Sequence, residues 1–115
     1  MKLALIAALA AALAAPAAFA RPAASTLVAT VGPGFTITLK SGTKKVTTLK
    51  AGTYTIKVAD KASTHNFHLT GPGVNKTTSV GAKVNATWKV TFKKGTYKYI
   101  CDPHAAFMKG SFKVT

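Results

Sequence analysis

Short runs in which apolar and polar residues alternate one by one recur through most of the chain. The apolar positions of these runs fall within residues 35–39, 54–58, 65–69, 88–92, 97–101 and 112–114. A period of two places every second side chain on the same face of an extended strand. Glycine- and proline-containing segments separate the runs, and no stretch after residue 20 carries apolar residues at helical spacing over three turns. The pattern therefore predicts strands and excludes a helical fold.

The composition of residues 21–115 favours the same structure, because this segment contains 17 Thr and 9 Val. β-branched side chains fit pleated surfaces better than helices. We count about seven or eight short strands separated by frequent turns. A segment of this length holds one small domain, so residues 21–115 are expected to form an all-β, Greek-key antiparallel β-sandwich.

Residues 1–20 differ from the rest of the chain and have the pattern of a signal peptide. Lys2 supplies a positive start, residues 3–15 are an apolar run, and the segment ends in an Ala-x-Ala pattern at Ala20. The apolar run is shorter than the roughly 20 residues that span a bilayer. We therefore expect cleavage between Ala20 and Arg21, and export to the periplasm or the medium.

The chain is strongly basic, with 16 Lys and Arg against 2 Asp and Glu and a formal net charge of +14. Nearly all of the basic residues are lysines that are spread evenly along the chain. Sequence-specific nucleic-acid binding normally uses arginine forks in a concentrated patch, so nucleic acid is not an expected partner. The charge favours an acidic partner protein and permits loose association with an anionic cell envelope. We expect a monomer.

The residues with the most distinctive chemistry lie in one segment near the C-terminus. Cys101 is the only cysteine, so its thiol is intermolecular, reactive or a metal ligand. His104 and Met108 follow in a Cys-x2-His-x3-Met pattern, and His65 on a distant inward face could complete the set. Two imidazoles and a thiolate in one plane, with a weak axial thioether, are the ligands of a type 1 blue-copper site.

Other interpretations of these residues are less consistent with the sequence. Cys101 could be a core residue and His104 a surface residue without any shared function. A zinc site would normally contain a second Cys or another His in place of Met108. A nucleophilic Cys-His pair would need an orienting carboxylate, an oxyanion motif and room for a substrate, so we do not expect an enzyme. His68 lies three positions after His65 and is expected to be exposed and not a ligand.

The chain resembles the small cupredoxins, which are type 1 blue-copper proteins, and is nearest to the plastocyanin and amicyanin group. The resemblance covers at least residues 50–115. It rests on the His65-Asn66 pair and on two motifs, Gly95, Tyr97, Tyr99, Cys101, Pro103, His104 and then Met108, Gly110, Phe112, Val114. By this resemblance one copper ion is bound by His65, Cys101, His104 and Met108. Asn66 is implied to connect the two ligand loops through its amide, against Asp102.

Two departures from the family pattern affect the site. The His104-to-Met108 spacing is one residue shorter than in plastocyanins and one longer than in amicyanins, so Met108 is the ligand that the resemblance determines least. Asp102 stands where Ser or Thr is common and places a carboxylate beside the thiolate. We expect this negative charge to favour Cu(II) and to lower the reduction potential.

The resemblance implies a function in carrying single electrons by cycling between Cu(II) and Cu(I). It also implies that His104 reaches the surface through an apolar patch formed by residues 105–107. The two Gly-Pro-Gly turns at residues 32–34 and 71–73 are candidate neighbours of that patch. A copper-binding module for delivery or buffering would have the same ligands, so the sequence does not separate the two functions. A third alternative is a metal-free sandwich that attaches to anionic envelope polymers.

Overall fold

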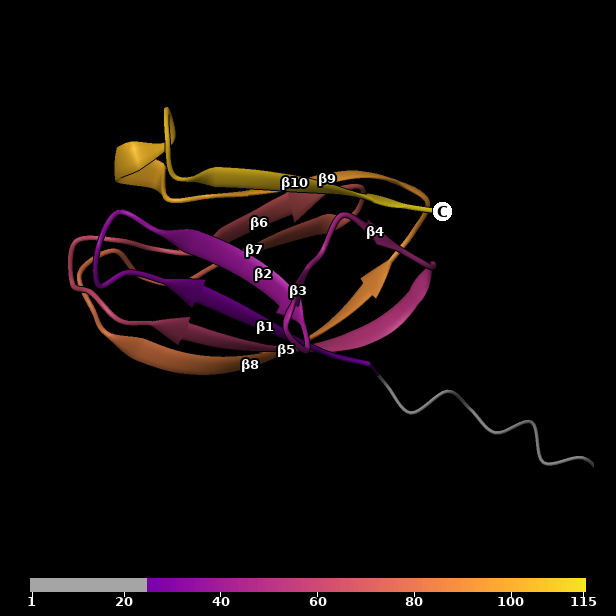
Figure 1. Cartoon of the computed structure of the whole chain (residues 1–115), viewed down its shortest axis with the longest axis horizontal. Helices are drawn as coiled ribbons and strands as arrows, with labels where there is room; N and C mark the ends of the chain where they lie inside the picture. The colour runs from indigo at the N-terminus through magenta and orange to yellow at the C-terminus, as the bar shows by residue number, and fades with distance from the viewer. Residues whose placement is uncertain (1–24) are drawn as a thin grey trace, which may run out of the picture.

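The computed structural model describes residues 25–115, which form two five-stranded sheets packed face to face (Figure 1). In spatial order the first sheet contains β3 (Lys44–Lys45), β2 (Ile37–Ser41), β1 (Thr26–Val31), β5 (Gly52–Asp60) and β8 (Val84–Phe92). The second contains β4 (Thr48–Leu49), β10 (Lys109–Val114), β9 (Gly95–Ile100), β6 (His68–Gly71) and β7 (Val74–Thr77). One short 3-10 helix, η1, spans Asp102–His104. The predicted leader and its cleavage point lie outside the described residues.

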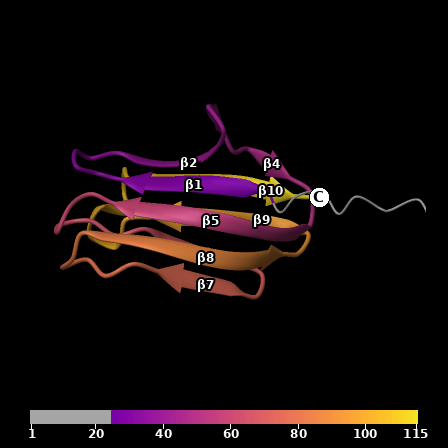
Figure 2. The same cartoon turned by 90° about the horizontal axis from the view of Figure 1, so that it is seen from below.

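The predicted all-β sandwich is confirmed, although its sheets are mixed and not purely antiparallel. Most neighbouring strands pair antiparallel, but β1 pairs with β5 and β4 pairs with β10 in parallel. The reason is the path of the chain between β1 and β5 (Figure 2). β2 returns alongside β1, the chain then crosses to the second sheet at β4, and it comes back as β5 in the direction of β1. Alternation along one strand does not reveal such a crossover.

The core lies between the two sheets and is filled by the inward residues of the alternating runs. The side chains of Leu27, Ala29 and Val31 in β1 are fully buried. The second sheet contributes aromatic rings, and Tyr97 stacks on Phe112 with the ring centroids 5.4 Å apart. Burial of a side chain as large as valine, leucine or phenylalanine contributes roughly 1.5–3 kcal/mol to stability, because apolar surface is removed from water. The alternation is therefore explained by burial on one face of each strand.

Phe35 departs from the predicted pattern. We expected it to share the inward face of Ile37 and Leu39, but 66% of its surface is exposed. β2 begins only at Ile37, and residues 33–35 form a bend before it. The bend breaks the period-two pattern, so Phe35 lies outside the core at one end of the sandwich.

Three connecting segments meet at the end of the sandwich opposite the C-terminus (Figure 1): the β1–β2 turn, residues 61–67 and the loop 101–108. The turn at residues 32–34 belongs to this end, since a Cβ on Gly32 would lie 3.2 Å from Cδ2 of His65. The turn at residues 71–73 does not, and this expectation was wrong. The register pairs His68 with Ile100 and Thr70 with Lys98, so the turn lies near the start of β9. There the Tyr97 hydroxyl donates a hydrogen bond to the carbonyl of Pro72 at 3.3 Å.

Within residues 25–115 no helix has the length and the apolar character needed to cross a membrane.

Candidate metal centre

Cys101 and His104 are fixed by a compact loop that connects β9 to β10. The Cys101 amide donates to the carbonyl of Met108 at 3.0 Å, which closes the loop. Inside it, the amides of His104 and Met108 donate to the carbonyls of Cys101 and His104, at 3.0 and 2.9 Å. Pro103 lies in the first turn of η1, where its missing N–H costs no hydrogen bond. The backbone of this loop is therefore largely determined by its own hydrogen bonds.

His65 reaches the same place from the segment that follows β5. Its side chain is buried, with 2% exposed. Two residues further on, Phe67 is bound to Thr78 through both its backbone amide and its carbonyl, at 2.9 and 3.0 Å. These contacts fix the short segment that carries His65 against the second sheet.

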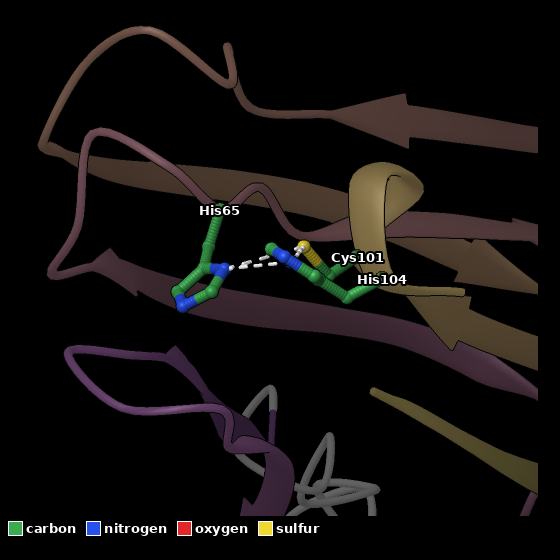
Figure 3. Close-up of side chains that lie close together, drawn as sticks. All are labelled: His65, Cys101 and His104. Carbon is green, nitrogen blue, oxygen red and sulfur yellow. Dashed lines mark hydrogen bonds between the residues drawn. The ribbon is translucent and has the colours of Figure 1, made fainter. Parts of the chain in front are cut away.

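Three potential metal ligands come together at the meeting point of the loops (Figure 3). The Sγ atom of Cys101 lies 3.6 Å from Nδ1 of His65 and 3.5 Å from Nδ1 of His104. The two nitrogens are 3.1 Å apart. The circumradius of this triangle is about 2.0 Å, close to the roughly 2.0–2.3 Å that histidine and cysteine keep from a first-row metal such as zinc. The three residues therefore fit a trigonal metal centre without rearrangement.

Met108 adds a fourth donor to this part of the molecule. It is the only methionine among the described residues and is 1% exposed. Its backbone bonds to Cys101 and His104 place it in the same loop as those two residues. A thiolate and a thioether with two imidazoles form a soft donor set that suits copper.

Asn66 joins the two segments that carry these residues, and its side chain is 2% exposed. Its Oδ1 accepts a hydrogen bond from the Asp102 amide at 2.7 Å. Its Nδ2 donates to Oδ2 of Asp102 at 2.6 Å and to the Thr77 hydroxyl at 3.0 Å. Because Asn66 follows His65 and Asp102 follows Cys101, these bonds hold the two segments in register.

We expect Asn66→Ala to lower copper affinity by about 10- to 100-fold, the usual cost of losing a group that orients metal ligands. The reason is that the Asp102 amide and carboxylate both lose a partner. Competition with a Cu(I) chelator measures the effect. Asn85→Ala is the matched control, because Asn85 is exposed on β8 and, unlike Asn66, does not bind Asp102 or Thr77. Equal affinities for the two variants would contradict this role of Asn66.

His68 forms an ion pair, although we expected a simply exposed side chain. Only 23% of its side chain is exposed, and Nδ1 lies 3.0 Å from both carboxylate oxygens of Asp102. Its Nε2 lies 2.7 Å from Oδ1 of Asn75. Both ring nitrogens face acceptors, which favours the imidazolium. The hydrogen bond that the His68 ring donates to the Asp102 carboxylate is the main cause that raises the pKa of His68, and the same bond lowers the pKa of Asp102.

We expect an NMR titration of the ring to give His68 a pKa above 6.5, and Asp102→Asn to lower it. The raised pKa of His68 means that the pair stabilises the fold at low pH and that this contribution disappears as the pH rises through that pKa. The lowered pKa of Asp102 means that it also disappears on acidification through the pKa of Asp102. The partial exposure of both groups limits the contribution to about 1 kcal/mol or less. A wild-type pKa at or below 6.5 would contradict the ion pair.

Asp60 is a buried acidic residue near the site that our sequence interpretation did not assign. Its side chain accepts hydrogen bonds from the Ala62 amide at 3.2 Å and the Thr78 hydroxyl at 3.1 Å. Burial raises the pKa of this carboxyl, and these two hydrogen bonds oppose the shift. Asp60 continues the inward positions of residues 54–58, so the alternation itself could have indicated its burial. It binds the start of the segment that carries His65 directly, and it is linked to Phe67 at the other end through Thr78.

Two exposed aromatic rings lie next to His104 at the surface and contact each other, and we call Phe35 and Phe107 the aromatic collar. Phe35 is 66% exposed and Phe107 is 59% exposed. Their ring centroids lie 5.1 and 5.5 Å from that of the half-buried His104, and 5.6 Å from each other. The sequence indicated Phe107, but Phe35 reaches the site only through the bend before β2.

Comparisons with known proteins agree with this geometry. Residues 33–115 match the model of the copper binding proteins of the plastocyanin/azurin family. Amicyanin-alpha from Methylorubrum extorquens is 42% identical over 69 residues, and the match covers 57% of each chain. The match thus spans little more than half the length of this relative.

Solved structures show the same fold. Reduced auracyanin from Roseiflexus castenholzii has a TM-score of 0.56 and 21% identity, over 79% of this chain and 97% of its own. Rusticyanin from Thiobacillus ferrooxidans has a TM-score of 0.54 and 24% identity, over 78% of this chain and 76% of its own. The family match covers most of the chain, and the donor set fits the metal. The chain therefore belongs to the plastocyanin/azurin family of copper-binding proteins, the cupredoxins, and its cofactor is copper.

Proposed function

We propose that the protein carries single electrons outside the cytoplasm, with copper held by His65, Cys101, His104 and Met108. The observation that supports this most directly is the triangle of one sulfur and two nitrogens, with edges of 3.1–3.6 Å, under an exposed aromatic collar. Copper, when bound there, supplies a Cu(II)/Cu(I) couple. The apolar segment at residues 1–20 supports export, and we propose that residues 21–115 are the mature domain.

The chain contributes to this function by holding the donor atoms in one arrangement. The thiolate of Cys101 favours Cu(I), and the imidazoles of His65 and His104 suit both oxidation states. Met108 would supply its thioether as the fourth ligand. The backbone bonds within loop 101–108 and the amide of Asn66 resist movement of these groups. A site that changes little between two oxidation states needs little reorganisation, and this favours rapid electron exchange.

The aromatic collar is the proposed route for electrons to the surface. His104 is the ligand nearest to solvent, since its ring is half-buried while His65 and Cys101 are buried. The two exposed apolar rings next to it give this part of the surface little polar character, so a partner can approach His104 closely. We propose a monomer and an acidic redox protein as its partner, because the lysine-rich surface attracts negative charge. The interface with this partner is expected to be small, as in other transient redox complexes.

The proposal is tested by adding Cu(II) to the metal-free protein and recording the visible spectrum and a voltammogram. We expect an intense blue thiolate-to-copper band and a reversible one-electron wave. A colourless protein would overturn the proposal. A blue protein that exchanges electrons slowly but transfers its copper to a metal-free acceptor would instead indicate copper delivery.

We expect Asp102→Ser to raise the reduction potential, because it removes a negative charge next to the thiolate. The effect should be modest, since His68 and Asn66 already compensate the carboxylate. A change of about 1 kcal/mol or less corresponds to roughly 40 mV for a one-electron couple. Voltammetry at pH 6 measures it. An unchanged or lower potential would contradict the expected role of Asp102.

A further inference from the structure

An open pocket with basic walls lies beside β9 and β10 of the second sheet, next to the metal centre. It has a volume of about 630 Å³, and three lysines line it: Lys45, Lys98 and Lys109. Ile100 and Ala105 supply apolar surface between them. The lysines come from β3, β9 and β10, so the pocket includes residues of both sheets.

The positive charge of this pocket is not compensated by the protein. Residues 25–115 contain two acidic side chains, Asp60 and Asp102. Asp60 is buried, and Asp102 pairs with His68. No lysine in this part of the chain forms a salt bridge with either carboxylate. An incoming carboxylate would therefore meet three unpaired ammonium groups around an apolar floor.

The pocket is also close in the chain to the proposed ligands. Ile100 is bonded through its peptide group to Cys101, and Ala105 is bonded in the same way to His104. Neither Phe35 nor Phe107 lines the pocket, so it is separate from the aromatic collar. A partner bound in the pocket would contact the chain neighbours of Cys101 and His104, which supply two of the three donor atoms. The aromatic collar would stay accessible.

We propose that this lysine pocket is a docking site for an acidic segment of the redox partner, in which Asp or Glu carboxylates pair with Lys45, Lys98 and Lys109. This inference rests on the proposed electron-carrier function. An acidic protein segment is favoured over an anionic membrane because the pocket is concave and local. A flat anionic surface would instead engage the lysines that are spread over the whole molecule.

The first test is an NMR titration of the reduced, copper-loaded protein with a hexaglutamate peptide at low ionic strength. We expect saturable shifts of the amides of Lys45, Lys98 and Lys109. The shifts at these three positions should disappear in the variant K45Q/K98Q/K109Q. They should persist in the variant K57Q/K61Q/K89Q. The control removes the same charge from β5, the residue after it and β8, none of which lines the pocket. Shifts spread over lysines of both sheets, or produced only by phosphatidylglycerol vesicles, would overturn the proposal.

The second test is stopped-flow oxidation of the Cu(I) protein by hexacyanoferrate(III). One electron passes to the complex, giving hexacyanoferrate(II) and the Cu(II) protein. We expect the pocket variant to react about tenfold more slowly at low salt, and the control variant less than about twofold more slowly. Equal slowing of both variants would show an effect of net charge alone and overturn the proposal. The peptide titration does not require electron transfer, so it still tests the pocket if the copper fails to cycle.

Discussion

Replacing Cys101 with Ser is expected to remove the intense blue absorption of the copper-loaded protein completely. The band arises from charge transfer between a thiolate and Cu(II), and Cys101 supplies the only sulfur in the triangle of donor atoms. We also expect Cu(I) affinity to fall by more than the roughly 10- to 100-fold that follows from losing a residue that only orients a ligand. The reason is that a soft anionic ligand is itself lost. Visible spectroscopy and chelator competition measure the two effects.

The control for this prediction must separate loss of the ligand from loss of the fold. Cys101 is fully buried, and Ser differs from it by one atom, so the NMR spectrum should keep its native dispersion. In the C101S background, Ser111→Cys restores a thiol on the exposed face of β10, away from the donor triangle. This double variant should remain colourless. A blue band in either variant would show that copper is bound through other groups.

The alternation in the sequence predicts which residues form the core, because burial on one face is a local property of each strand. Tyr97, Tyr99 and Cys101 are all buried, as the alternation along β9 and into the residue after it requires. The prediction fails at Phe35, where a bend interrupts the strand and exposes the ring. It also does not reveal the parallel pairing of β1 with β5, which depends on a crossover between sheets.

The residues of the metal centre could be predicted because they lie in recognisable motifs, the Cys-x2-His-x3-Met pattern and the His65-Asn66 pair. The contacts around the motif depend on strand register, which no single strand specifies. Pairing of His68 with Ile100 brings the imidazole beside Asp102, and this explains an ion pair that the spacing of His65 and His68 did not suggest. The lysine pocket arises in the same way, from strands that are distant in the sequence.

Gly110→Ala is expected to destabilise the fold strongly, because the new methyl group would overlap the ring of Tyr99. Gly110 pairs with Tyr99 across β10 and β9, and a Cβ there would lie too close to the ring and its hydroxyl. The ring cannot move away easily, since it is 1% exposed and stacks on Phe67 at 5.3 Å. Overpacking of this kind costs about 3 kcal/mol, or roughly 10–20 °C in Tm for a domain of this size.

Gly81→Ala is the matched control, because a Cβ on Gly81 meets nothing within 4 Å. It should leave Tm nearly unchanged in thermal unfolding of the metal-free protein. In a Tyr99→Leu background the ring is absent, so Gly110→Ala should cost much less than in the wild type. That difference isolates the contact between the two residues. If Gly110→Ala lowered stability equally in both backgrounds, its effect would arise from the backbone of β10. The close approach of the strand to Tyr99 would then not be the reason for a glycine at this position.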